Sequence, residues 1–160
     1  MPPSEQLRKL SREDKDALRF ARNIARGLQI RADLRQVRGY AINILENFLQ
    51  AHFELEERSL IGRLDPLQRM HESVTVVMQQ HSEFGTIGAC LLHAGEELLR
   101  QQLIEFHQLL ERHVHYEEHH FFPYIERCLD EQQLLLAQQE IRGAQIVDCS
   151  HWPDPYWKPA

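Results

Sequence analysis

Histidine and glutamate recur at a spacing that places both side chains on one face of a helix. In the segment HVHYEEHHFFPY (113–124), His113 precedes Glu117 by four residues, and in AHFELEE His52 precedes Glu56 by the same interval. Residues four apart are neighbours on the surface of an α-helix. Imidazole and carboxylate together form a ligand set that suits iron, manganese and zinc. The spacing therefore predicts two half-sites for a metal on two different helices.

Both pairs, and His81 in a third segment, continue the apolar stripe of their helix toward the core. A single histidine on an apolar face is usually a core residue with a hydrogen-bond partner, but here there are three, and two have a carboxylate four residues on. A buried carboxylate without a partner costs several kcal/mol. A metal pair bridged by Glu56 and Glu117 and capped by imidazoles would neutralise both carboxylates. These residues are therefore expected to form one buried site.

The other polar residues of 113–124 lie on different faces of the predicted helix. His115 and His119 point about 150° away from the apolar stripe and are expected in solvent, as is Glu118. His120 lies at the edge of the stripe, either supporting a ligand or as a boundary histidine. HYEEH also matches the H-x-x-E-H pattern of inverted zinc proteases, but its histidines are expected on the wrong face for a core site.

The first helix offers one further candidate, Asp14, near the centre of its apolar stripe. Two interpretations remain open. Asp14 can ligate the metal as the contribution of a fourth helix. Alternatively, SRED (11–14) is a capping-box pattern in which Ser11 caps the helix and Asp14 reaches back to the Ser11 amide.

Long segments with apolar residues at three-and-four spacing must position these side chains, which predicts an all-α fold. The predicted helices cover residues 11–29, 32–64, 67–93, 96–128 and 130–142. Connections of a few residues favour an up-down-up-down four-helix bundle with a short fifth C-terminal helix. In that arrangement antiparallel neighbours bring His52, His81 and His113 to about the same height. Residues 1–142 are expected to form the bundle domain, with 143–160 an irregular, proline-rich and aromatic tail that packs on it.

Composition limits the partners and the compartment. The chain has 160 residues, is 42% hydrophobic and carries a net charge of −6. Lys and Arg are dispersed, which argues against nucleic acid, and no apolar stretch is long enough for a membrane span or forms a signal peptide. The cytoplasm is therefore the expected location. Cys90, Cys128 and Cys149 are far apart and form no C-x-x-C pair, so reduced thiols are expected.

Four segments of the chain, in order, resemble the hemerythrin-like family, also called HHE domains. They are LSREDKDALRFARNI, AHFELEERSLIGRL, VVMQQHSEF and HVHYEEHHFFPYIERCL, and the resemblance covers about residues 10–130. The two H-x-x-x-E-E elements are its most specific part, and the FFP that follows the second strengthens it. The resemblance implies a four-helix bundle with a non-haem di-iron centre. Carried over by position, the ligands are His52, Glu56, His81, His113 and Glu117.

The sequence departs from the family in the first helix, where Asp14 and Lys15 stand at positions that are histidine in the family. One iron therefore loses an imidazole ligand. Three alternatives follow for that iron: it gains a carboxylate ligand from Asp14, it keeps a water in that position, or its site stays empty. The resemblance implies a protein that binds or senses dioxygen or a related small oxidant, or that handles iron, and a metal-binding or sensor role rather than an enzymatic one. A mononuclear site, manganese or zinc are alternatives to di-iron. The competing hypothesis is a structural or interaction bundle with an incomplete metal site. A homodimer is one form that such a bundle can take.

Overall fold

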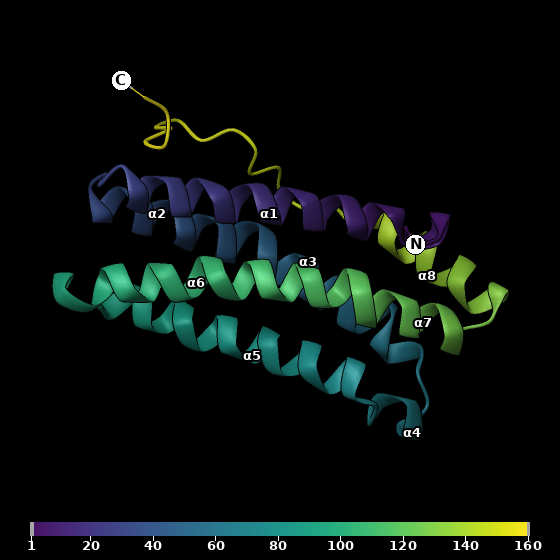
Figure 1. Ribbon diagram of the computed structural model, residues 1–160. Coiled ribbons are helices and arrows are strands. Elements are labelled where there is room, and N and C mark those ends of the chain that lie inside the picture. The colour runs from purple at the N-terminus through teal and green to yellow at the C-terminus, as the bar shows by residue number, and fades with distance from the viewer. Residues whose placement is uncertain (1, 160) are drawn as a thin grey trace.

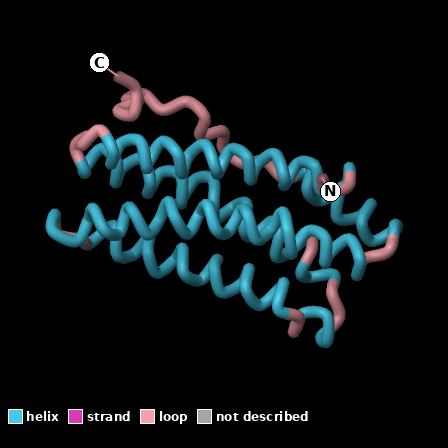
Figure 2. The backbone as a smooth tube through the Cα atoms, viewed as in Figure 1, coloured by secondary structure: helices cyan, strands magenta, loops and turns pink. Residues whose placement is uncertain are grey.

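The computed structural model describes residues 2–159, and these residues form helices, turns and loops without a β-strand (Figures 1 and 2). The predicted all-α bundle is confirmed. Four long helical rods run side by side and alternate in direction (Figure 1). The first and third are α1 (Arg8–Gln29) and α5 (Glu72–His93). The second joins α2 (Leu34–Ile44), η2 (Leu45–Leu49) and α3 (Gln50–Ser59). The fourth joins α6 (Glu96–Tyr116), η4 (Glu117–Phe121) and α7 (Phe122–Cys128).

The segments η2 and η4 are single π-helical turns inside otherwise continuous rods. A π-turn closes hydrogen bonds to the fifth residue instead of the fourth, so it accommodates one extra residue. The first π-turn ends three residues before His52, and the second begins at Glu117. Such turns occur frequently at functional sites. Both deviations from regular helix therefore lie next to residues that the sequence marks as metal ligands.

The first rod begins earlier than predicted. Helix α1 starts at Arg8, directly after the short 3-10 helix η1 (Glu5–Leu7), so Ser11 lies inside the helix. Of the two interpretations of SRED, this excludes the capping box, and the Ser11 hydroxyl donates instead to Glu118 Oε1 on the fourth rod at 2.7 Å. The helix ends at Gln29, and Arg31 two residues later adopts a left-handed conformation with φ of 56°.

The connection between the second and third rods is more broken than predicted. The second rod ends at Ser59 instead of residue 64, and η3 (Ile61–Arg63) and α4 (Pro66–Arg69) follow. Asp65 caps α4 by accepting from the Gln68 amide at 2.8 Å. A new helix then begins at Glu72, so the predicted continuous helix from residue 67 is wrong. The short helix α8 (Glu131–Gly143) lies within one residue of its prediction and is capped by Asp130.

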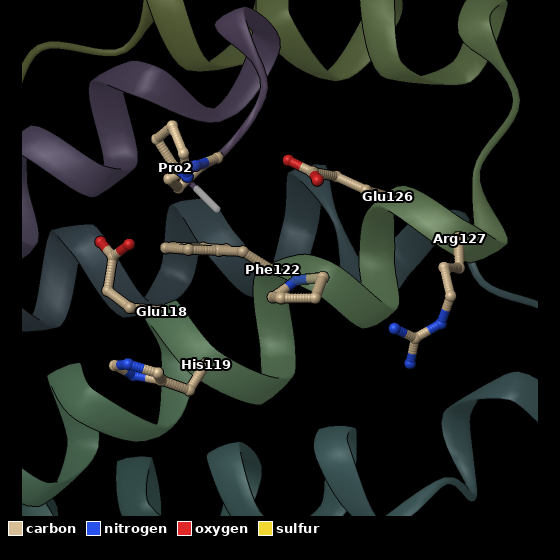
Figure 3. Close-up of a pocket in the computed structure, with 8 residues that line it drawn as sticks. Pro2, Glu118, His119, Phe122, Glu126 and Arg127 are labelled. Atoms are coloured by element: carbon tan, nitrogen blue, oxygen red, sulfur yellow. The ribbon is translucent and has the colours of Figure 1, made fainter.

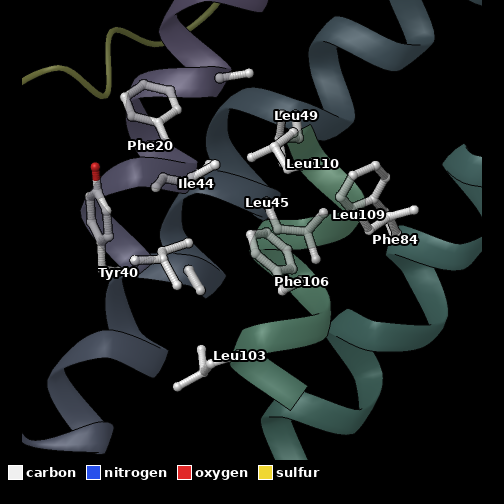
Figure 4. Close-up of a cluster of buried hydrophobic side chains, with 14 of the residues drawn as sticks. Phe20, Tyr40, Ile44, Leu45, Leu49, Phe84, Leu103, Phe106, Leu109 and Leu110 are labelled. Carbon is white, nitrogen blue, oxygen red and sulfur yellow. The ribbon is translucent and has the colours of Figure 1, made fainter. Parts of the chain in front are cut away.

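The interior of the bundle contains two apolar clusters. One cluster, part of which Figure 4 shows, includes Phe20, Tyr40, Phe84 and Phe106 from all four rods. The other surrounds Phe121 toward the α7 and α8 end. Along every rod the predicted metal ligands lie between residues of the two clusters. The buried polar residues thus form a layer that separates two apolar halves of the core.

The tail after α8 runs along α1 without regular structure (Figure 1). Tyr156 is buried, and the Trp157 ring lies 4.8 Å from the ring of Tyr40. Gly27 makes this packing possible, since a Cβ atom there would lie 2.2 Å from the Tyr156 ring. Cys149 of the tail is also buried, and the three cysteines are free thiols. No helix within residues 2–159 has the length and apolar character needed to cross a membrane.

Candidate metal centre

The structure brings all six predicted ligands together in the polar layer. Asp14 comes from α1, His52 and Glu56 from α3, and His81 from α5, while His113 and Glu117 lie at the junction of α6 and η4. Five of the six residues have at most 1% of their surface exposed, and the His81 side chain has 6%. Every rod therefore contributes at least one acid or imidazole to a single buried cluster.

One half of the cluster lies around His52. Its Nε2 atom is 3.2 Å from Asp14 Oδ1 and 3.1 Å from Glu56 Oε1. Glu117 completes this half, because one ligand atom from each of these four residues lies within 4.8 Å of the others. A cation here would meet three carboxylates and one imidazole.

The other half lies around His81 and His113. His113 Nε2 is 2.9 Å from Glu117 Oε1, and His81 Nε2 is 3.5 Å from Glu56 Oε2 and 3.8 Å from Glu117 Oε1. These four residues also bring one ligand atom each within 4.8 Å of one another. Glu56 and Glu117 belong to both halves. This sharing is the arrangement that two bridging carboxylates require.

The polar atoms of the cluster lack hydrogen-bond partners, which is a second reason to expect a cation there. The carboxylate oxygens of Asp14, Glu56 and Glu117 are buried and have no hydrogen-bond partner within residues 2–159. The Nε2 atoms of the three histidines are in the same state. Buried polar groups are nearly always hydrogen-bonded, and each exception needs an explanation. Since all these orphaned atoms face one another, bound cations provide that explanation.

In the metal-free chain the pKa values of the three carboxylates are shifted in different directions. Burial raises the pKa of Asp14 from 3.8 to about 7. Burial and repulsion from Glu56 hold the pKa of Glu117 well above its ordinary value. Burial acts in the same direction on Glu56, but attraction to His52, which lies 3.1 Å away, outweighs burial and lowers the Glu56 pKa. In the metal-free chain Glu56 therefore loses its proton at the lowest pH of the three, and a metal would displace any proton that Asp14 or Glu117 retains.

The pKa values of two of the histidines are also shifted in opposite directions. Burial acts to lower the pKa of His52, but the charge of Glu56 and the contact with Asp14 outweigh it, and the pKa is held well above 6.5. Burial and repulsion from His81 lower the pKa of His113 to about 3. His113 is therefore neutral at physiological pH and has an unprotonated nitrogen ready for a metal.

Polar residues outside the cluster hold two of the three histidines by their other ring nitrogen. His81 Nδ1 lies 2.7 Å from Glu57 Oε1, and His113 Nδ1 lies 2.9 Å from Gln80 Oε1. Since both partners present an acceptor oxygen, each Nδ1 carries the proton and each Nε2 is left with a lone pair facing the cluster. Histidine ligands in metalloproteins are typically oriented in this way. No sequence pattern marks Gln80 except its position directly before His81.

Aromatic rings close the site on the side of His81. The Phe53 ring stacks on the His81 ring with centroids 4.1 Å apart and planes 16° apart. Phe84 lies edge-on to His113 at 5.6 Å. Apolar walls of this kind exclude water and strengthen the electrostatic interactions within the cluster.

The remaining histidines of 113–124 are not part of the cluster. His115, His119 and His120 are exposed, as predicted for the first two, and the rings of His115 and His119 stack on each other at 4.1 Å. The protease-like pattern HYEEH therefore faces away from the core. Glu118 differs from its prediction because it is only partly exposed and accepts the hydrogen bond from Ser11.

A surface pocket of about 530 Å³ adjoins the same segment (Figure 3). Glu118, His119, Glu126 and Arg127 line it, and none of the six predicted ligands does. Glu126 is already occupied, since its Oε1 accepts from the Ser4 amide at 2.6 Å. The pocket is thus a feature of the outer surface and separate from the buried cluster.

Comparison with known proteins supports the assignment of the cluster. The family model of the hemerythrin HHE cation-binding domain matches residues 5–125, a span that holds all six clustered residues. Searches of curated proteins and of solved structures gave no significant match. With four antiparallel rods, ligand-type residues on each of them and a family match over most of its length, the chain belongs to the hemerythrin HHE cation-binding domain family.

Proposed function

We propose that the protein holds a pair of non-haem iron ions in this cluster and uses them to bind or sense dioxygen or a related small oxidant. The observation that carries the proposal is the membership of Glu56 and Glu117 in both halves of the cluster. Two carboxylates that serve two ligand sets are suited to two ions. A single ion would leave one half of the orphaned donor atoms without a partner.

Five ligands come from the two H-x-x-x-E elements and His81, and we propose Asp14 as the sixth. With the capping role excluded by the start of α1 at Arg8, the buried Asp14 carboxylate has no polar neighbour that explains its place except the cluster. Asp14 then takes the place of the imidazole that the family has on the first helix. Its negative charge makes the half around His52 the more anionic one and favours a hard cation there.

The ligand that the pair meets is expected to be small. Five of the six residues are at most 1% exposed, so a bulky substrate has no direct access to the ions. Iron, when bound, supplies redox chemistry that none of these side chains has. The protein's own contribution is to hold the donors in place, to spread charge over the shared carboxylates and to keep water away through Phe53 and Phe84. Because the side chains hold the ions and none of them is placed to act on a larger substrate, the site supports binding or sensing more than catalysis.

Iron content and optical spectra test the proposal. Protein purified without oxygen from iron-supplemented cells should contain about two equivalents of iron, and exposure to air should produce a near-ultraviolet absorption band. The His115→Asn/His119→Asn double variant is the matched control, because it removes two exposed histidines from the same segment and should keep its iron. Less than about one equivalent of iron or manganese in metal-replete protein would refute the proposal. It would favour a structural or interaction bundle with an incomplete site.

A further inference from the structure

His52 differs from the other two clustered histidines on its outer side. The Nδ1 atoms of His81 and His113 each lie within hydrogen-bond distance of an acceptor, but neither ring nitrogen of His52 has a hydrogen-bond partner within residues 2–159. Its Nδ1 lies 3.6 Å from Glu13 Oε1, which is too long for a good hydrogen bond. The torsion that orients an imidazole ring is broad. The His52 ring is therefore the one of the three that no acceptor holds on its outer side.

Glu13 is itself an unpartnered buried acid. It is 8% exposed, and neither carboxylate oxygen has a hydrogen-bond partner in the described chain. On its outer side Glu13 lines a groove of about 640 Å³ between α1 and the tail segment 144–150. Phe48 lines the same groove and lies parallel to the His52 ring at 6.1 Å. Glu13 and Phe48 thus connect the surface groove directly to one metal ligand.

The charges of the groove leave Glu13 available to a cation. Of the two cationic residues that line it, Lys9 donates to the carbonyl oxygens of Ile141 and Ala144, and Arg19 pairs with Asp16 at 2.6 Å. Glu13 and the exposed Asp148 form no ion pair with a lysine or arginine among residues 2–159. The groove lining has three carboxylates, Glu13, Asp16 and Asp148, against the two cations Lys9 and Arg19, and this negative excess favours a divalent cation.

The opposite half of the cluster lacks such a route. Glu57 also reaches the surface, with 37% of its side chain exposed, but it lies at hydrogen-bond distance from His81 and fixes that ring. Gln80 holds His113 in the same way and carries no charge. Ligands that are held on their outer side exchange metal slowly, because a departing ion must break bonds to rings that cannot turn away.

We propose that the groove over Glu13 is the route by which divalent cations reach and leave the centre. The position at Asp14 and His52 is the exchangeable one, and the position at His81 and His113 retains its ion. Glu13 acts as a transient carboxylate ligand that receives the cation from the groove and passes it to His52. This inference rests on the proposed pair of metal ions.

Release of ferrous iron to a chelator tests the inference. The full-length protein is loaded anaerobically with Fe²⁺, and an excess of a chromogenic ferrous chelator is added. The wild type should lose its iron in two phases of about one equivalent each. Glu13→Gln keeps the shape of the side chain but removes its charge, so it should slow the fast phase about tenfold and leave the rate of the slow phase unchanged.

Two variants of the groove surface sharpen the comparison. The Asp16→Asn/Arg19→Gln double variant removes a groove ion pair without changing the net charge of the groove and should leave both phases unchanged. Asp148→Asn removes a groove carboxylate that forms no ion pair and should slow only the fast phase, by less than Glu13→Gln and less still at high salt. Asp148 is fully exposed, so this variant keeps the test valid if Glu13→Gln does not fold.

The outcomes separate this inference from the proposed function. Two equivalents of iron that leave in a single phase would overturn the exchangeable position while the metal pair stands. A fast phase that both Glu13→Gln and Asp148→Asn leave unchanged would overturn the route through the groove. A chain that takes up no Fe²⁺ would refute the proposed function itself.

Discussion

Substitution of Asp14 by asparagine should make the metal-free protein more stable and the metal-loaded protein less stable. The carboxylate is 1% exposed, and burial raises its pKa from 3.8 to about 7. A shift of about three units corresponds to about 4 kcal/mol at a pH above both values. The buried amide of asparagine has its own desolvation cost of about 1–3 kcal/mol. The expected net gain for the metal-free variant at pH 8 is therefore about 1–3 kcal/mol.

The sign of the pH dependence follows from the raised pKa. Below pH 3.8 Asp14 is protonated in both the folded and the unfolded chain and has no effect on their balance. As the pH rises toward 7, the unfolded chain loses this proton first, so the folded state becomes progressively less stable. His113 acts in the opposite direction near its ordinary pKa, because it is neutral when folded. Only the difference between wild type and Asp14→Asn isolates the carboxylate.

Urea denaturation of both metal-free proteins at pH 5 and pH 8 measures that difference. The variant's advantage should grow by about 3 kcal/mol between these values. With iron bound the order should reverse, because the variant lacks a charged ligand. The reasoning is refuted if the stability difference between the metal-free proteins does not change with pH. It is refuted equally if Asp14→Asn binds two equivalents of iron as tightly as the wild type.

Four further changes test other parts of the structure. Removal of iron with a chelator should lower the melting temperature, since a ligand at a hundred times its Kd stabilises by about 2.7 kcal/mol, and an unchanged melting curve would argue against a filled site. Gln80→Leu removes the acceptor that holds His113, so iron affinity in a competition titration should fall about tenfold, and equal affinity would show that Gln80 does not orient the ring. Gly27→Ala places a methyl group against Tyr156 and should cost about 1–3 kcal/mol in urea denaturation and expose the tail to proteolysis. Gly39→Ala, in open helical surface, should be neutral or slightly stabilising.

Helical periodicity was sufficient to predict the bundle and to find the clustered residues. His52, Glu56 and Glu117 interrupt apolar stripes, and a polar residue in such a stripe is visible without any structure. Their convergence also followed from the alternating direction of the rods, since helix rise alone sets the height of each residue. Whether a metal binds them, and which one, stays a prediction that the experiments above address.

Side-chain contacts between different rods could not be predicted from the sequence. Ser11 matched a helix cap locally, but its hydroxyl has a partner on the fourth rod, and local patterns contain no information about that partner. Glu13 and Gln80 flank predicted ligands and lie off the centre of their stripes, so periodicity gave them no special role. The break at residues 70–71 was missed because the helix that begins at Glu72 is capped by His71, whose Nδ1 accepts from the Ser73 amide, and histidine is not among the residues that usually mark a helix start.

The π-turn at Glu117–Phe121 gives the exposed histidines a role that does not depend on their imidazole rings. His119 and His120 lie within the turn, and the extra residue that it accommodates sets the angle between Glu117 and the buried Phe121. Deleting either histidine would let the turn close as ordinary α-helix, so the apolar residues after it would keep almost the same register and only the backbone at Glu117 would change. Both positions should thus accept almost any substitution, whereas a deletion should spare the fold and disturb the candidate metal centre. In this segment the number of residues is constrained more strongly than their identity.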